Sequence, residues 1–271
     1  MDTQNVLALG EKESHFLARM AAESRTIFST AEAEAFWEGG TPLPLFLHRL
    51  VTKGWLKRLQ HGVYLLVPLE AGVERAWSES PLVIAPYLVK PAAVAYWSAL
   101  HYWQFTEQLP RLTFVQSTRR KRPVEILGLR FRFVTVRAAH YFGVAQRSWH
   151  GQTISLTDPE KTLLDCADRP DLSGGLAQLA QALPAATGLD WPKLDAYLER
   201  WGGGAVVKRL GYLVEHLHLP MPHREQRLDR WQQLLTRGIA ALEPGAGAAG
   251  PIVTRWRLRL NVALPAARRS I

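Results

Sequence analysis

One stretch near the N-terminus, Thr41–Pro68, limits the possible folds more than any other part of the chain. Its first half spaces apolar residues for one face of an amphipathic helix, which we expect to end at Gly54. Two apolar runs follow, Trp55-Leu56 and Val63–Val67, on either side of the turn Gln60-His61-Gly62. A helix followed by a strand, a basic turn and a second strand is the layout of a winged helix-turn-helix, with the hairpin as the wing.

The charges of this stretch are of one sign. Residues 39–69 contain four cations and no acid, whereas residues 1–38 contain three cations and seven acids. Clustered lysines and arginines neutralise DNA phosphates, and acids on the same face would repel them. The net charge of +9 for the whole chain also favours an acidic partner. We therefore expect residues 39–69 to bind double-stranded DNA; the alternative is a protein-binding winged helix with a basic surface.

Helical position divides the expected DNA contacts into two groups. Residues at and after the start of the helix should lie nearest the bases in the major groove: Thr41, Pro44, Leu45, His48 and Arg49. Residues of the helix end and of the hairpin should contact phosphate or, at the wing tip, the minor groove: Lys53, Lys57, Arg58 and His61.

A chain of 271 residues can form two domains. Residues 70–80 are small and polar, so we expect a winged helix over 1–69, a linker over 70–80 and a second domain over 81–271. No run of about 18 apolar residues predicts a membrane span, and the N-terminus lacks the pattern of a signal peptide. With a single cysteine, Cys166, the composition indicates the cytoplasm and excludes an internal disulfide.

The rest of the chain predicts an α+β protein, whose second domain is mixed α/β with a small sheet and a helical tail. Expected helices are 11–24, 29–37, 81–88, 92–103, one opening at Asp158, 173–183, 190–201, 205–218 and 224–241. Expected strands are 112–117, 125–136 and 152–156, with 252–262 returning to the same sheet.

A second basic region lies in the predicted sheet. Residues 116–150 contain eight cations and one acid, Glu125. Its candidate binding residues are Arg119, Arg120, Lys121 and Arg122 in a loop and Arg130 and Arg132 on one strand face. This patch could follow a phosphate backbone, or receive RNA or an acidic partner protein; the structural alternative is a solvated hairpin tip.

Two further groups of residues indicate other functions for the second domain. Asp158 and Glu160, followed by Lys161, suggest a metal-dependent nuclease, but their spacing differs from that motif and helix capping accounts for them. Trp97, His101 and Tyr102 could line the pocket of a ligand-sensing transcription factor. No other group of residues has the spacing of a known catalytic or metal-binding motif, so we expect no enzyme activity, cofactor or metal site.

Three segments resemble the AbiEi family of antitoxins and transcriptional regulators. They are the run Gly54–Tyr64 that closes the wing, the helix containing Ala99-Leu100-His101, and the segment Ile154–Asp165 before the helical tail. Their order matches the family over nearly the whole chain. One departure is the segment Gly39–Pro44, whose two prolines should shorten the recognition helix.

The resemblance implies a function as well as a fold. Members of this family are the antitoxins of type IV-like toxin–antitoxin systems that act in bacterial phage defence. The resemblance implies an N-terminal domain that binds promoter DNA and represses its own operon. It also implies a C-terminal domain that counters a nucleotidyltransferase-like toxin encoded beside it. The lack of a predicted membrane span indicates no membrane partner.

Overall fold

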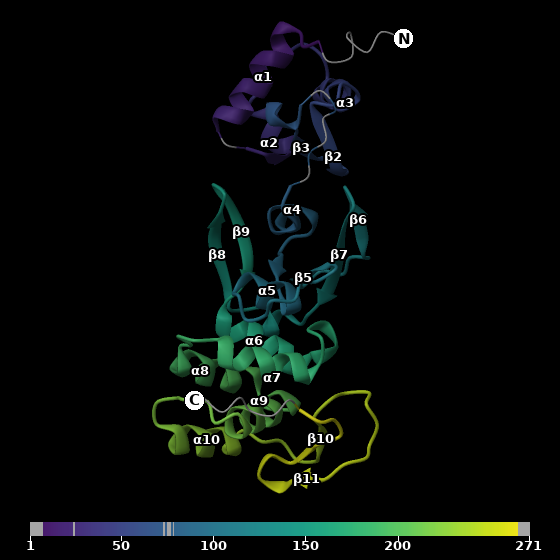
Figure 1. Ribbon diagram of the computed structural model, residues 1–271. Helices are drawn as coiled ribbons and strands as arrows, with labels where there is room; N and C mark the ends of the chain where they lie inside the picture. The colour runs from purple at the N-terminus through teal and green to yellow at the C-terminus, as the bar shows by residue number, and fades with distance from the viewer. Residues whose placement is uncertain (1–7, 24, 73, 75–76, 78, 265–271) are drawn as a thin grey trace.

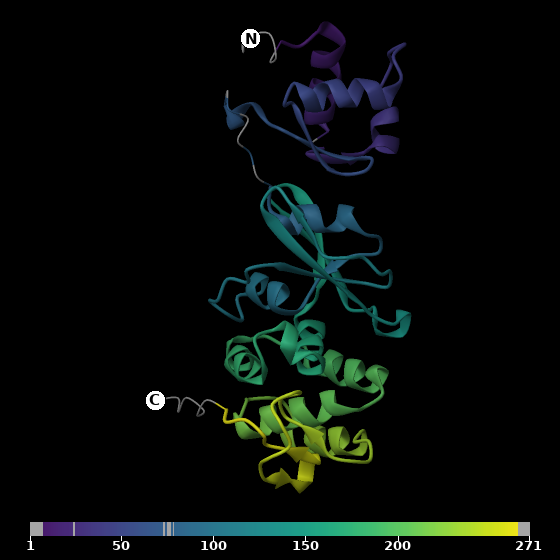
Figure 2. The same ribbon diagram turned by 90° about the vertical axis from the view of Figure 1, so that its right-hand side faces the viewer.

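The computed structural model describes residues 8–23, 25–72, 74, 77 and 79–264. The described parts form an elongated stack of three layers (Figures 1 and 2). The N-terminal helices and their small sheet form one end, a six-stranded sheet lies in the middle, and a group of helices forms the other end. The α+β class predicted from the sequence is confirmed.

The N-terminal layer is a winged helix-turn-helix. Its elements are α1 (Glu11–Ala22), β1 (Ile27–Ser29), α2 (Thr30–Glu34), α3 (Leu43–Thr52), β2 (Leu56–Gln60) and β3 (Val63–Leu66). The strands form an antiparallel sheet in the order β1-β3-β2. Because Gln60 pairs with Val63, the wing is a tight hairpin whose turn is His61-Gly62.

Local chemistry explains where these helices begin and end. Ser29 caps α2 in a capping box with Glu32: the Glu32 amide donates to Ser29 Oγ at 3.2 Å, and the Ser29 amide donates to Glu32 Oε2 at 2.7 Å. Pro42 precedes α3, so the helix starts at Leu43 and has ten residues. Gly54 follows its end with a φ of 77°, in the left-handed region that suits glycine.

The middle layer is a mixed sheet with two helices. Its elements are α4 (Pro81–Leu88), β4 (Ala93–Val94), α5 (Tyr96–Tyr102), β5 (Thr113–Ser117), β6 (Val124–Ile126), β7 (Leu129–Thr135), β8 (Val144–Trp149) and β9 (Gln152–Thr157). The strand order is β6-β7-β5-β4-β9-β8. Helix α4 lies between the β6–β7 and β8–β9 hairpins (Figure 1).

Two predictions for this layer were wrong in detail, and one strand was missed. The expected helix 92–103 begins only at Tyr96, because Ala93 and Val94 form a buried strand between β5 and β9. The expected strand 125–136 is a hairpin, because Leu127 and Gly128 both have positive φ and form its turn. Strand β8 was not predicted. It forms one edge of the sheet, where all of its residues are half-exposed or exposed, so apolar and polar residues alternate only weakly along it.

The helical layer contains α6 (Pro159–Asp168), α7 (Leu176–Ala185), α8 (Trp191–Trp201), α9 (Ala205–His216) and α10 (Arg224–Gln233). A small sheet in the order β10-β12-β11 follows, made of Ala240–Ala241, Leu258–Arg259 and Ile252–Val253. Four short 3-10 helices connect elements along the described chain: Leu69–Ala71, Ala138–His140, Pro170–Leu172 and Thr254–Trp256.

The C-terminal predictions need two corrections. Helix α10 ends at Gln233 rather than near residue 241. The segment 252–262 does not return to the six-stranded sheet but pairs within the small sheet. A 3-10 turn interrupts it and buries the Trp256 side chain completely against α9, where a Cβ on Gly211 would lie 2.1 Å from the indole. This packing, rather than strand pairing, decides the path of the chain.

The winged helix and the six-stranded sheet meet through α4. Leu59 and Leu65 of the wing sheet and Val83, Ile84 and Leu88 of α4 are buried in one apolar cluster. Within the expected linker 70–80, residues 73, 75–76 and 78 lie outside the described residues. One face of the wing sheet therefore packs on the middle layer through Leu59 and Leu65, and the other packs on the core of the winged helix through Leu56 and Tyr64. None of the described helices is long and apolar enough to cross a membrane.

Candidate nucleic-acid interface

Helix α3 has one buried face and one exposed face. Leu43, Phe46, Leu47 and Leu50 are buried in the core of the winged helix. The exposed residues of the opposite face include Pro44, Leu45, His48 and Arg49. Thr41, just before the helix, is half-buried and accepts a hydrogen bond from Trp37 Nε1 through its carbonyl oxygen at 3.0 Å. Figure 2 looks onto the side of the molecule where α3 lies above the β2–β3 hairpin.

The wing tip adds positive charge beside this face. Arg58 and His61 are exposed, and Arg58 Nη2 donates to His61 Nδ1 at 2.9 Å. Between α3 and the wing is a hollow of about 370 Å³, whose lining includes Thr30, Pro44 and His61. Helix, hollow and wing tip thus form one continuous exposed surface. No acidic residue occurs between residues 39 and 69 of the sequence, so nothing in this segment repels a phosphate backbone.

Two of the predicted phosphate contacts are engaged inside the protein. Lys53 Nζ lies 2.6 Å from Glu13 Oε2 and donates to the carbonyl of Ala8 at 2.9 Å. Burial alone would raise the pKa of Glu13, but hydrogen bonds from Lys53 and from the Gly10 amide lower it below its usual value. Both ammonium contacts would have to be exchanged before Lys53 could bind phosphate.

Lys57 is engaged in a similar way. Its Nζ donates to the carbonyl of Trp77 at 2.6 Å, which joins the wing to the segment leading into α4. Arg58, the next residue, is exposed to solvent. Of the four cations predicted in this segment, Arg49 and Arg58 are therefore the exposed ones.

The structure divides the second basic region into two surfaces. Lys121 Nζ donates to Gln60 Oε1 of the wing at 2.6 Å and to the carbonyl of Leu88 at 2.5 Å, and it lies 5.5 Å from the centre of the Phe133 ring. The neighbouring loop residues Arg119, Arg120 and Arg122 are exposed. We define these three arginines as the loop arginines.

Arg130 and Arg132 lie elsewhere. Arg132 packs over the ring of Phe114, 5.8 Å from its centre, and Arg130 Nη2 donates to the carbonyl of Arg111 at 3.4 Å. Residues 132 and 133 are neighbours in a strand, so their side chains point to opposite faces of the sheet. The face that carries Arg132 is therefore opposite to the one on which Lys121 contacts Phe133.

Sequence reasoning missed one residue of this interface, Gln60. Its Nε2 donates to the carbonyl of Tyr87 at 2.8 Å while its Oε1 accepts from Lys121. A glutamine in an expected turn carries no signal of such a role, and the structure shows it instead as the last residue of β2. Its partners are 27 and 61 residues away in the sequence, so only the folded chain brings them together.

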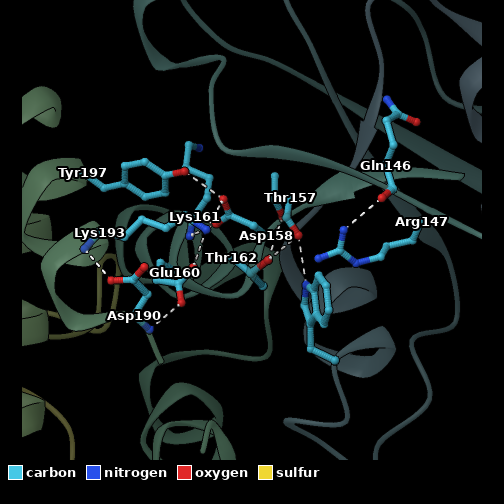
Figure 3. A network of polar contacts seen from close by, with 11 residues as sticks. Gln146, Arg147, Thr157, Asp158, Glu160, Lys161, Thr162, Asp190, Lys193 and Tyr197 are labelled. Carbon is cyan, nitrogen blue, oxygen red and sulfur yellow. Dashed lines mark hydrogen bonds and ion pairs between the residues drawn. The ribbon is translucent and has the colours of Figure 1, made fainter. Parts of the chain in front are cut away.

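The residues of the nuclease alternative form a helix cap and an ion-pair network. Asp158 Oδ1 accepts from the Lys161 amide at 2.8 Å, and Asp158 Oδ2 accepts from Tyr197 Oη at 2.8 Å. Lys193 Nζ lies 2.9 Å from Asp158 and 2.8 Å from Glu160 (Figure 3). Both carboxylates are thus paired with one lysine, which fastens α8 to the start of α6.

Lys161 is turned into the core instead of toward these carboxylates. Its side chain is completely buried and pairs with Asp165, one helical turn further on. Burial raises the pKa of Asp165 to about 6, although Lys161 and the Gln116 amide oppose this shift. The three residues of the proposed nuclease motif therefore do not face a common site. In the part of the chain that the structure describes, no group of three or more His, Cys, Asp or Glu side chains could hold a metal ion.

The residues of the ligand-sensing alternative belong to α5. Tyr102 packs against Trp103 and Trp149 in the apolar core of the middle layer. Buried nitrogens of Trp97 and His101 have no hydrogen-bond partner among the described residues. Two hollows of the described residues lie in the winged helix, away from α5. Cys166 is fully buried, and burial raises the pKa of its thiol.

Comparison with known proteins adds to this geometry. Residues 15–67 match the family model described as "Transcriptional regulator, AbiEi antitoxin". Among solved structures, the chain is similar to the RV2827C protein from Mycobacterium tuberculosis, with a TM-score of 0.64 and 16% sequence identity over 93% of this chain and 92% of that one. At this identity the likeness concerns the fold alone. No curated protein matches the sequence.

The matched segment begins within α1 and ends just after β3. It therefore contains nearly the whole winged helix, including α3 and the wing. The other two segments that resemble the family in sequence, around Ala99-Leu100-His101 and over Ile154–Asp165, lie outside it. The resemblance to the AbiEi antitoxins and transcriptional regulators is confirmed over residues 15–67, the part of the chain that folds as the winged helix.

Proposed function

We propose that this protein is a DNA-binding antitoxin that binds double-stranded DNA in the promoter of its own operon and represses it. The observation that supports this best is the exposed, acid-free surface formed by α3 and the wing within the segment that matches the AbiEi regulators. In helix-turn-helix proteins the second helix of the motif enters the major groove and its N-terminal residues contact base edges.

The contacts follow from the exposed side chains. Pro44, Leu45, His48 and Arg49 would face the bases from α3, with Thr41 at the helix start. Arg49 is the side chain best suited to a guanine, because a guanidinium can donate two parallel hydrogen bonds to its major-groove edge. Arg58 and His61 would contact phosphate or the minor groove at the wing tip; Lys53 and Lys57 would join them only after leaving Glu13 and Trp77.

A binding series tests this part of the proposal. The full chain is titrated against a duplex from upstream of its own gene and against a scrambled duplex of equal length, at several salt concentrations. We expect specific binding to exceed non-specific binding by a factor of about 10³ or more. Equal affinity for both duplexes would contradict promoter recognition. A reporter driven by the same promoter should be repressed in cells that express the chain.

The antitoxin part concerns a second partner. We propose that the chain counters a nucleotidyltransferase-like toxin encoded beside it, without enzyme activity or a cofactor, and acts in the cytoplasm where both partners are found. Support comes from the family whose model matches residues 15–67. Asp158 and Glu160 also support it, because Lys193 pairs with both carboxylates and joins α8 to α6. Co-expression with the neighbouring gene should restore growth; a chain that fails to rescue a toxic neighbour would contradict this role.

A further inference from the structure

The loop between β5 and β6 is held against the wing. Lys121 bridges Gln60, the last residue of β2, and the carbonyl of Leu88 at the end of α4. Gln60 is also fixed to α4 through the carbonyl of Tyr87. Because Gln60 directly precedes His61, these contacts place the loop beside the wing tip. In Figure 1 the end of β2 is directed toward β6, in agreement with these contacts.

We propose that the loop arginines, Arg119, Arg120 and Arg122, form a second phosphate-binding element of the same DNA interface. They would extend the footprint from the wing along the duplex backbone. The inference rests on the proposed DNA-binding function and deepens it: the wing and the loop act as one surface, although they come from different layers of the molecule.

The side chains of this loop fit that role. All three arginines are exposed, while the lysine between Arg120 and Arg122 is turned inward and used as an anchor. A guanidinium on an anchored loop loses less freedom on binding than one on a mobile tail. The only acid within residues 116–150, Glu125, lies opposite Arg130 in the β6–β7 ladder. A phosphate backbone that passes the wing tip would therefore meet positive charge in this loop.

The other cations of this region provide an internal control. Arg130 and Arg132 carry the same kind of charge in the same domain but lie apart from the anchored loop, where they contact the carbonyl of Arg111 and the ring of Phe114. Arg111 is a further exposed arginine, just before β5 and so at the end of that strand opposite to the loop. If DNA were held only by general attraction to a basic domain, removing either set of three arginines would weaken binding equally. Direct contact would depend only on the loop arginines.

The test compares two triple variants of the full chain, R119A/R120A/R122A and R111A/R130A/R132A, on the promoter duplex. Each variant removes three positive charges. The logarithm of the association constant falls with the logarithm of the salt concentration with a slope of about −0.9 for each phosphate contact. We expect the loop variant to flatten this slope by about 2.7 and the control variant to keep the wild-type slope. Thermal unfolding verifies that both variants are folded.

A third variant, R119K/R120K/R122K, keeps the charges and should restore the slope, since lysine also binds phosphate as a point charge. Equal slopes for the loop variant and the wild type would overturn the inference, as would equal flattening by both triple variants. A loop variant that keeps its DNA slope but loses growth rescue against the neighbouring toxin would assign the loop to a protein partner instead. Failure of the wild type to bind the promoter would instead contradict the proposed function itself.

Discussion

The winged helix and the start of α6 use their charges in opposite ways. In the winged helix, Arg49 of α3 and Arg58 of β2 are both exposed. At α6, Lys161 is completely buried against Asp165, and Lys193 of α8 holds two carboxylates. Both regions are charged motifs in the sequence, but one leaves two of its four cations available to a partner and the other uses its lysines to join elements.

The difference has a simple physical basis. Removing a charge from water costs several kcal/mol unless a partner of opposite sign compensates it. Lys161 therefore requires Asp165, and neither group is available to an external ligand. An exposed arginine keeps its hydration and gives it up only when a phosphate replaces it. A charged motif therefore indicates a binding site only where the fold leaves the charge exposed.

The largest expected effect comes from breaking the buried pair. Asp165→Ala leaves Lys161 buried without its carboxylate, so we expect the free energy of unfolding to fall by about 3–5 kcal/mol. Chemical denaturation of the full chain measures this change. Asp171→Ala is the matched control, because Asp171 pairs with Arg169 at the surface, where such a pair contributes about 0–1 kcal/mol. Similar losses for the two variants would remove the distinction between buried and exposed charges.

The next effect concerns the exposed face of α3. The double variant H48A/R49A should weaken promoter binding by about 1–3 kcal/mol for each base that the two side chains recognise, without lowering the melting temperature. Gel-shift titration and thermal unfolding measure the two quantities. Lys12→Ala, at an exposed position on α1, is the control and should leave specific binding unchanged. If the double variant bound as tightly as the wild type, α3 would not be the recognition helix.

A smaller effect is expected at the cap of α2, where a charge of the winged helix has a structural role. Ser29→Ala removes the hydroxyl that accepts from the Glu32 amide and donates to the Glu32 carboxylate, so stability should fall by about 1 kcal/mol near pH 7. Burial would raise the pKa of Glu32, but its hydrogen bonds with Ser29 lower it overall.

The pH dependence of the same variant follows from this direction. A lowered pKa stabilises the folded state above the pKa of the unfolded chain, and that contribution is lost as the pH falls through the folded pKa. The difference between wild type and Ser29→Ala should therefore shrink below about pH 4.5, the unperturbed value. Denaturation curves from about pH 7 to about pH 3 test this, and a difference that grows on acidification would contradict the assignment.

The smallest effect separates two neighbouring cations of the wing. Arg58→Ala should flatten the salt dependence of promoter binding by about 0.9, the value for one phosphate contact. Lys57→Ala should leave that slope unchanged, because its ammonium is held by the carbonyl of Trp77. Gel shifts at several salt concentrations distinguish the two. A larger flattening for Lys57→Ala would show that this lysine leaves its internal partner when DNA binds.

Much of the winged helix could be predicted from the sequence because its signals are local. The apolar spacing of α3, the glycine after it and the turn at His61-Gly62 each depend on residues a few positions apart. The capping box at Ser29 and Glu32 and the cap at Asp158 are likewise contained within one turn of helix. None of these features requires a distant partner in the sequence.

Other features were decided only by the tertiary structure. Strand β4 exists because two other strands flank it, and the segment around Trp256 follows the space left by Gly211 rather than the large sheet. The second basic region was predicted as one patch, but the pleat of β7 separates Arg132 from the loop.

The same limit applies to the interface itself. Sequence composition determined that the wing stretch would be basic and free of acids, because that requires only counting. Which of its cations remain exposed depends on Glu13, which holds Lys53, and on the carbonyl of Trp77, which holds Lys57. Glu13 meets Lys53 when α1 packs on α3, whereas Trp77 reaches Lys57 when the segment before α4 lies against the wing. Local pattern thus determined the winged helix, and long-range packing decided which of its charges face outward.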